Sequence, residues 1–448
     1  MEENKNKKSS FCERLGNTSD ITISKLATAA ITIALAFPGV VAILAMFNKT
    51  KDYSLSWHML ATQSYILPEL CVIAFIIYII IFLRAKKQNA SLKDILKKNP
   101  LIIIFSILVI WMFVSQVYNG LGYALKGYSV ISLGETFDME IAYFIFVLFC
   151  GTQVKVEKHK IFLMRVHMLI SLLLVVGGFV LWKNVFDFEL IHVRPDGFVS
   201  IFGNTNHYGY YLALTIPLAG SAFLIEKKMA WKILAVFTFV ANTIALSLND
   251  TMGSWIGGAF AVVFIVIVQY LVNKKVNVKA VILIPVFAIC LIVPSLLAGR
   301  FEENFSTLFS DVGKIAAGDE EAIAAGSYRW AEWTSSCEVI GENKLFGIGF
   351  EGPEYRKDIY IYNARPHNEF IEYTLFYGIP VGVLYFVGCL GFFIRALKKK
   401  KHMDGATLAC LTAAFGYLVS SFFGVTVFST AMFLFMFLGM GYVHDKDE

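Results

Sequence analysis

The sequence predicts an all-α integral membrane protein with about 12 transmembrane helices. Its 448 residues are 57% hydrophobic and only 16% charged, whereas soluble domains carry about a quarter of their residues as charge. The mean hydropathy is +0.63, and apolar runs of membrane-spanning length recur along almost the whole chain.

Twelve apolar runs approach the roughly 20 residues that a helix needs to cross the hydrocarbon core. Only a short gap after Val425 separates the last two runs. We therefore expect spans at residues 24–46, 66–84, 101–118, 138–154, 166–182, 206–225, 233–249, 254–272, 279–298, 369–394, 406–424 and 427–443.

The charges between these runs predict the orientation. With the N-terminus in the cytoplasm, most of the 39 Lys and Arg fall in inside segments, as the positive-inside rule requires. The expected organisation is a cytoplasmic tail (1–23), spans one to nine (24–298), an extracytoplasmic cap loop (299–368), spans ten to twelve (369–443) and a second cytoplasmic tail (444–448).

The long loop between spans nine and ten should contain short helices. Its stretch "SYRWAEWTSSCEVIGEN" has a helical pattern, with Ser327 as a candidate cap. Trp330, Trp333, Cys337 and Ile340 would share one face of that helix.

The seven cysteines show no paired spacing, and most lie within apolar runs. A cysteine in such a run packs as a small hydrophobic residue, so we expect neither disulfides nor a metal cluster.

His367 is the first candidate for chemistry. It comes just before an apolar run, with Arg365 two residues earlier and Asn368 and Glu369 after it. An imidazole at the membrane surface suits a general base, and its polar neighbours could orient the ring. The alternative is an interfacial histidine without a role, and Glu369 could simply favour the helix N-terminus.

A second candidate segment is "HVRPDGFVSIFGNTNHYG", which leads into a span. Arg194 offers a fork of donors to a phosphate, although it could equally anchor at lipid headgroups. Asn204 and Asn206 could bind a sugar or could serve as ordinary turn residues, and His207 is a second candidate base.

The long loop supplies the third set. Arg329 lies near the start of its helix, and Gly347 and Gly349 bracket a turn in "NKLFGIGFEGPEY". Among the other outside charges, Arg300, Arg356 and Lys357 are most simply solvated, and Asp250 is either a boundary residue or a member of the site.

The chain contains no P-loop and no dinucleotide-binding fingerprint. Any reaction at the outer face must therefore draw its energy from the substrate or from a gradient. An activated lipid-linked substrate fits: arginines would hold its diphosphate, and a histidine would deprotonate a hydroxyl.

These segments together resemble the O-antigen ligase and polymerase superfamily of bacterial membrane glycosyltransferases. The similar segments are Arg194 with "GFVSIFGNTNHYG", then "YRWAEWTSSCEVIGENKLFGIGFEGPEY", then "RPHNEFIEYTLFYGIPVGVLYF". They lie in the family's order over roughly residues 190–390. One family arginine is missing near "NDTMGSW", and Arg300 and Arg365 are candidates to replace it.

The resemblance implies a metal-independent, inverting glycosyltransferase in the bacterial plasma (inner) membrane, without a cofactor. The donor would be a glycan on undecaprenyl diphosphate, and the acceptor a sugar or lipid-sugar. His367 would be the base, with Arg194 and Arg329 on the diphosphate and Asn206, Asn368, Arg300 and Arg365 as further substrate-binding residues. Membrane lipids are expected partners and a chain-length regulator is a candidate; nucleic acid is not expected.

Two choices stay open. The residues do not distinguish a polymerase from a ligase, because both activate a hydroxyl with similar groups. The alternative function is a multi-pass transporter or flippase of polysaccharide or lipid-linked sugars, but many such proteins have matching halves and ionisable residues at midplane. Here the longest loop is late and outside, and the spans are nearly free of charge at their centres.

Overall fold

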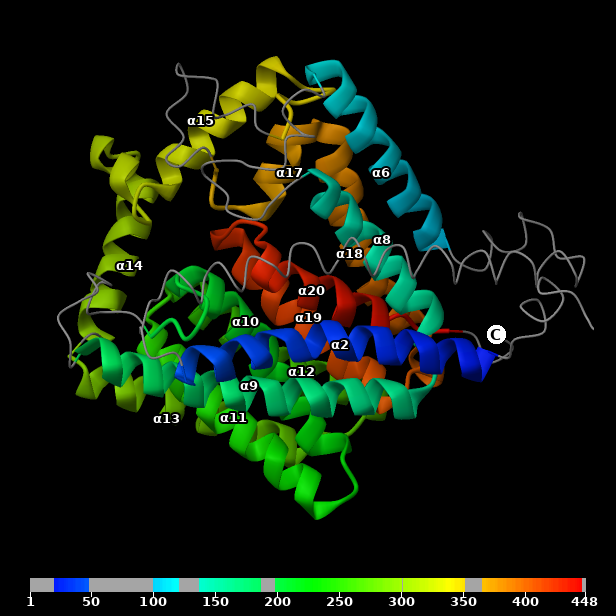
Figure 1. Ribbon diagram of the computed structural model, residues 1–448. Helices are drawn as coiled ribbons and strands as arrows, with labels where there is room; N and C mark the ends of the chain where they lie inside the picture. The colour runs from blue at the N-terminus through cyan, green and yellow to red at the C-terminus, as the bar shows by residue number, and fades with distance from the viewer. Residues whose placement is uncertain are drawn as a thin grey trace, which may run out of the picture.

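The computed structural model describes residues 20–47, 100–120, 137–186, 198–299, 301–350 and 365–444. Throughout these ranges the regular structure is helical, without a strand (Figure 1). The helices are α2 (Asp20–Phe47), α6 (Pro100–Asn119), α8 (Phe137–Gln153), α9 (Glu157–Phe186), α10 (Thr205–Ile225), α11 (Met229–Asn249), α12 (Met252–Asn273), α13 (Val278–Leu297), α14 (Phe301–Ala317), α15 (Arg329–Glu342), α17 (Glu369–Tyr377), α18 (Ile379–Lys398), α19 (Gly405–Ser420) and α20 (Phe428–Met440), with short 3₁₀ helices η1 (Glu320–Ala324), η3 (Lys400–His402) and η4 (Ser421–Phe423).

Eight of the described helices are long and apolar enough to cross a membrane, which confirms an all-α integral membrane protein. They are α2, α9, α10, α11, α12, α13, α18 and the stretch Gly405–Phe423 formed by α19 and η4. The apolar stretches Ile103–Asn119 and Ser429–Met440 are shorter. The predicted span 66–84 lies outside the described residues, so a total of twelve stays a prediction.

The bundle is built around α10. Within the apolar 18-residue stretch of α10, 83% is buried inside the protein, whereas the corresponding share in the peripheral α13 is 28%. Glycines let its neighbours approach closely: a side chain on Gly257 of α12 would meet the Gly416 carbonyl at 2.7 Å, and one on Gly416 of α19 would meet the Ala213 carbonyl at 2.2 Å. Helices in lipid associate through such small-residue contacts, because lipid tails are as apolar as the side chains.

The other helices pack around this centre in pairs. α2 lies along α9, α20 along α8, and α6 along α18. In Figure 1, α2 and α9 run side by side across the view, and α14 rises at the opposite end of the molecule from the C-terminus. The helices α14, η1 and α15 fall in the loop that was predicted at 299–368.

The predicted span 369–394 is divided in two. Gly378, with φ +88°, separates α17 from α18, and a Cβ there would meet the Leu345 carbonyl at 2.2 Å. The turn before residue 350 is hydrogen-bonded to the end of α17, since the Ile348 and Gly349 amides donate to the Leu375 and Phe376 carbonyls at 3.0 and 2.9 Å. These bonds satisfy carbonyls of the last turn of α17, at the end where the helix stops before Gly378.

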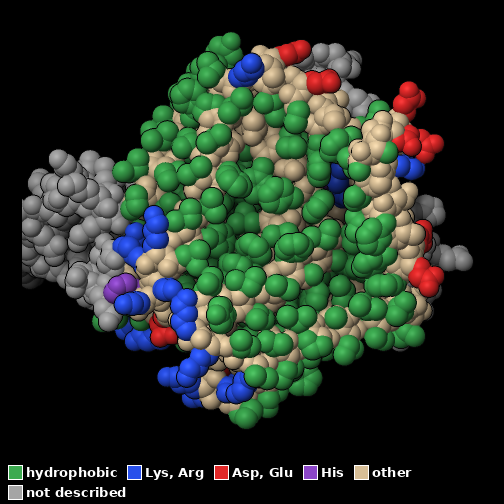
Figure 2. Space-filling model, turned by 180° about the vertical axis from the view of Figure 1, so that it is seen from behind, with side chains coloured by type: hydrophobic (Ala, Val, Ile, Leu, Met, Phe, Trp, Pro, Cys, Tyr) green, Lys and Arg blue, Asp and Glu red, His purple; other side chains and the backbone are tan. Residues whose placement is uncertain are grey.

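Charge is distributed unevenly over the surface. Figure 2 shows Lys and Arg gathered mainly at one end, most of the Asp and Glu towards the other, and a broad hydrophobic surface between them. Exposed apolar residues such as Ile233, Phe260 and Ile289 belong to the candidate spans α11, α12 and α13. A hydrophobic surface between two charged ends is typical of a protein that lies within a bilayer.

Candidate functional site

A polar cluster forms where four segments meet: the first turn of α10, the start of α15, residues 365–368, and the start of α17. Each helix start is set by local chemistry. Asn204 caps α10 by accepting from the Asn206 and His207 amides, and Asn368 caps α17 by accepting from the Phe370 and Ile371 amides at 3.1 Å.

His367 is paired with a buried acid. Its Nδ1 lies 2.9 Å from Oε2 of Glu332, whose side chain is only 1% exposed, while the histidine itself is 22% exposed. An ionised carboxylate can only accept, so Nδ1 carries the proton and Nε2 is left as the basic atom. His367 also has φ +47°, the left-handed conformation that histidine adopts more readily than most residues.

Arg329 is one turn before Glu332 on α15. Its Nη2 donates to Oδ1 of Asn206 and its Nη1 to the Gly326 carbonyl, both at 3.4 Å. Among the described residues no carboxylate pairs with this guanidinium, and its Nε has no hydrogen-bond partner. The spacing of three places Arg329 and Glu332 on one helix face, so α15 holds a cation and the partner of His367 together.

Tyr210 and His207 on α10 connect these groups. The half-buried His207 is close enough to Arg365 and His367 for their charges to act on it. The buried Tyr210 is similarly close to Arg329 and Arg365. The two arginines and His367 therefore lie around the first turns of α10.

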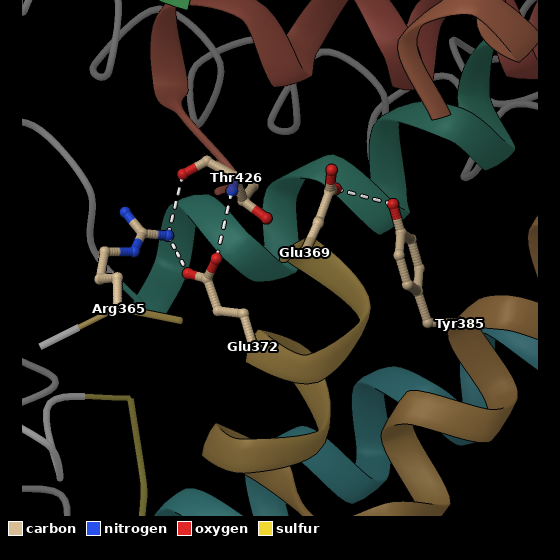
Figure 3. Close-up of polar contacts among 5 residues, drawn as sticks. All are labelled: Arg365, Glu369, Glu372, Tyr385 and Thr426. Atoms are coloured by element: carbon tan, nitrogen blue, oxygen red, sulfur yellow. Dashed lines mark hydrogen bonds and ion pairs between the residues drawn. The ribbon is translucent and has the colours of Figure 1, made fainter. Parts of the chain in front are cut away.

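Arg365 has a carboxylate of its own. Its Nη2 donates to Oε1 of Glu372 and, at 2.9 Å, to the Thr426 carbonyl, and the Thr426 amide donates to Oε2 of Glu372 at 3.3 Å (Figure 3). Glu372 is 2% and Arg365 12% exposed. The ion pair joins the segment before α17 to α17 itself, and the two hydrogen bonds with Thr426 connect both to the segment before α20.

Glu369 points away from Arg365 in Figure 3 and accepts a hydrogen bond from the Tyr385 hydroxyl at 2.7 Å. It lies on α17, outside the eight candidate spans. Burial raises the pKa of the Glu369 carboxyl to about 7, against the opposing effect of the Tyr385 hydrogen bond.

The structure brings together Asn206, Arg329, Arg365, His367 and Asn368, all predicted from the sequence. Of the remaining predicted residues, Arg194 and Arg300 lie outside the described residues, as do Arg356 and Lys357. Asp250 ends α11 in a left-handed conformation and accepts from Nδ2 of Asn304 at 2.5 Å.

One detail of α15 differs from the prediction. The predicted cap at Ser327 is wrong: Tyr328 occupies the N-cap position without a side-chain hydrogen bond. The buried residues of the helix are Ala331, Glu332, Ser336 and Val339, whereas Cys337 is exposed. The helix turns Glu332 inwards because His367 provides a partner for its charge.

Three residues of the cluster were not predicted: Glu332, Glu372 and Tyr210. The spacing of Glu332 from Arg329 was visible in the sequence, but an acid within an acidic loop is normally solvated. Glu372 and Tyr210 follow His367 and His207 by five and three residues, and only their burial distinguishes them from ordinary first-turn residues.

The cluster can abstract a proton and bind an anion. A partly exposed histidine held by a buried carboxylate is the arrangement of a general base. Arg329 lies next to an amide side chain and, as far as the described residues go, has no carboxylate partner, so its planar fork of donors can bind phosphate oxygens.

Comparison with known proteins agrees with this chemistry. Residues 235–386, about a third of the chain, match the family model described as O-antigen ligase. The match contains Arg329, Glu332, Arg365 and His367, and begins after Asn206. No curated protein matches the chain. This match over residues 235–386 confirms the predicted resemblance to the O-antigen ligase superfamily.

Proposed function

We propose that this membrane protein transfers or polymerises glycan from an undecaprenyl-diphosphate-linked donor at the outer face of a bacterial plasma membrane. The observation that carries the proposal is the pairing of His367 with the buried Glu332, one helical turn from Arg329, which has no carboxylate partner within the described part of the chain. The family match that contains all three residues supports it.

In this mechanism Nε2 of His367 takes the proton from an acceptor hydroxyl. The acceptor oxygen attacks the anomeric carbon of the donor sugar, and the bond from that carbon to the diphosphate oxygen breaks. Undecaprenyl diphosphate leaves with the bonding electrons, so negative charge grows on the oxygen that Arg329 would contact. One direct displacement inverts the anomeric centre, and the chemistry requires no metal.

The remaining predicted residues receive supporting roles. Asn206 orients Arg329 through its side-chain oxygen, and Arg194 and Arg300 contribute further donors to the diphosphate. Arg365 positions His367 two residues later, because Glu372 and the Thr426 carbonyl hold its guanidinium. Asn368 starts α17 directly after the base.

The proposed orientation rests on charge. The Lys- and Arg-rich end would face the cytoplasm, and with it both termini, so that the site would lie at the outer face. His444, near the C-terminal end of the chain, is close to Lys155 and Lys160. An outer-face site suits a reaction driven by a lipid diphosphate rather than by a cytoplasmic nucleotide.

The test is glycan transfer by purified protein in detergent with an undecaprenyl-diphosphate-linked oligosaccharide, comparing wild type with His367→Ala. We expect the variant to lose about 10²- to 10⁴-fold in rate, the usual contribution of a general base. Longer lipid-linked chains from wild type identify a polymerase, and product that requires a second acceptor identifies a ligase.

A control variant, His402→Ala, changes an exposed histidine in η3 and should transfer at the wild-type rate. Full activity of His367→Ala would remove the base from the mechanism. No turnover by wild type with any lipid-linked donor would contradict the proposed function itself.

A further inference from the structure

An apolar groove lies between α12, α18 and α19. Its cavity is about 310 Å³, and its walls include Phe264 and Val268 of α12, Leu390 and Phe393 of α18, and Leu411 and Phe415 of α19. Of the described residues that line it, Lys400 and Thr412 alone carry an ammonium or hydroxyl group, and the Cys389 thiol is a weak donor. A cavity with so few hydrogen-bonding groups suits a hydrocarbon and not a sugar.

The groove exists because α18 stands apart from its neighbours. Among the described helices α18 packs on α6 and α17, while α12 packs on α19, α10 and α13. Phe264, Phe393 and Phe415 bridge the space, with ring centroids 4.1 Å apart for Phe264 and Phe415 and 6.0 Å for the other two pairs. The aromatic rings leave an apolar channel instead of a close helix contact.

The shape of the groove selects a long chain. Its lining runs from Leu408 of α19 to Phe422 of η4, a length of about 21 Å at roughly 1.5 Å per residue. That length is most of the roughly 30 Å hydrocarbon thickness of a bilayer. One end is at Lys400, whose Nζ donates to the Leu271 carbonyl at 3.3 Å, and the other end is at Phe370 and Phe422.

The end at Phe422 adjoins the candidate site. In η4, Phe422 lines the groove and stacks with Phe370 at 4.6 Å. The ring of the next residue, Phe423, lies against that of Trp333 on α15, with 6.3 Å between the ring centroids. The Phe423 carbonyl accepts a hydrogen bond from the Tyr210 hydroxyl at 3.4 Å. A single 3₁₀ turn therefore separates the groove from the cluster that contains Arg329 and His367.

We propose that this groove binds the isoprenoid chain of the lipid-linked donor, with the diphosphate beyond η4 at the site. The inference rests on the proposed function and adds the place where the donor's lipid lies. A bulk phospholipid would also find the walls apolar, but the end of the groove at the cluster favours a lipid whose head group reacts there.

The first test varies the donor's chain length in two matched variants. Leu390 and Ile394 lie one turn apart on α18 and are both 42% exposed, but only Leu390 lines the groove. For wild type we expect a lower KM with an undecaprenyl donor than with a donor of two or three isoprene units. Leu390→Trp should raise the KM of the long donor about tenfold, roughly two methylene groups of lost burial, and leave that of the short donor unchanged.

Ile394→Trp should keep both KM values. The inference is overturned if Leu390→Trp affects long and short donors equally, if Ile394→Trp has the same effect as Leu390→Trp, or if wild type shows no preference for chain length. Thermal unfolding of each variant in detergent separates lost binding from lost folding.

A second measurement does not depend on transfer. Wild-type protein in phosphatidylcholine nanodiscs is photolabelled with a diazirine-bearing polyprenyl diphosphate, and the labelled peptides are mapped. We expect labels on α12, α18 and α19 that unlabelled polyprenyl diphosphate removes and added phosphatidylcholine does not. Equal competition by the phospholipid, or labels elsewhere, would assign the groove to ordinary bilayer lipid.

The two proposals can fail separately. His367→Ala should keep the labelling while it loses transfer, because the groove is built from other helices. Labelling of the groove in a protein without transferase activity would contradict the proposed function and leave the lipid site standing. Transfer without labelling of the groove would contradict the lipid site and leave the proposed function standing.

Discussion

Two arginines show how differently the two ends of the molecule use charge. Arg165 on α9 donates from Nε and Nη2 to the two carboxylate oxygens of Glu226, both at 2.7 Å, and lies 4.4 Å from the ring of Trp231. Arg329 on α15 donates only to an amide oxygen and a carbonyl, each at 3.4 Å. The first charge is neutralised within the protein, whereas no carboxylate among the described residues pairs with the second, which under the proposed function would bind an anionic ligand.

The comparison predicts that Arg329 matters for transfer and little for stability. Arg329→Ala should lower the rate by about 10²- to 10³-fold, the usual loss when one donor to a developing anion is removed. The measurement is transfer of lipid-linked glycan under saturating acceptor, alongside thermal unfolding. Because no carboxylate in the described ranges would lose a partner, the unfolding temperature should change little.

Arg329→Lys tests the geometry of the fork. A lysine keeps the charge but not the planar donors, so it should restore only part of the rate. A lysine variant as active as wild type would show that charge alone suffices. A large fall in the unfolding temperature of Arg329→Ala would instead place Arg329 with Arg165 as a structural residue.

Glu332 allows the base to be tested without removing it. In Glu332→Gln the new amide can donate to Nδ1 of His367, which favours the tautomer with the proton on Nε2, where it cannot accept another. We expect kcat to fall about 10²-fold with an unchanged KM for the donor. Separate kcat and KM measurements check this, and Glu332→Asp should recover part of kcat.

The control is Glu338→Gln, which changes an exposed acid on the same helix and should leave kcat intact. Parallel changes in KM and in stability would indicate that Glu332 merely holds α15 in place. Those changes would contradict its role as the positioning residue of the base.

The sequence predicted the helical membrane class and most of the cluster because both depend on local signals. Apolar runs set the spans. Polar residues directly before the apolar run at 369, such as Arg365 and His367, can be recognised in the sequence because the residues after them are apolar. The partners were out of reach: Glu332 is 35 residues from His367, and Thr426 is 61 residues from Arg365. Which acid is buried depends on how α15 packs, and no periodicity in the segment specifies that.

The division of the predicted span 369–394 has a similar cause. The stretch is apolar almost throughout, so hydropathy treats it as one helix. The break at Gly378 follows from the approach of the turn at Leu345, whose carbonyl leaves no room for a Cβ. Only the tertiary contact reveals that α17 is a separate short helix and that Glu369 lies outside a span.

For Arg165 we expect the opposite of Arg329, namely a loss of stability without a loss of transfer. Arg165→Gln would leave Glu226, which is 5% exposed, without its ion pair, and should lower the free energy of unfolding by about 2 kcal/mol. Thermal unfolding in detergent measures the loss, and transfer per folded molecule should stay at the wild-type value. Lys227→Gln removes the same charge from an exposed neighbour and should be neutral. An equally stable Arg165→Gln would mean that the pair contributes nothing.

Glu369 sharpens the contrast through the pH dependence of stability. Its pKa in the folded protein is about 7, above the ordinary value of 4.5, so the folded state holds this proton more tightly than the unfolded state. The resulting stability is complete below about pH 4.5 and is lost as the pH rises through 7. Glu369→Gln should remove this loss. The difference in unfolding free energy between the variant and wild type should therefore grow, in favour of the variant, by about 1 kcal/mol per pH unit between pH 5 and 7. If the unfolding free energies of wild type and Glu369→Gln change in parallel over this pH range, Glu369 titrates like an exposed acid. The burial of its carboxyl on α17 would then have no effect on stability.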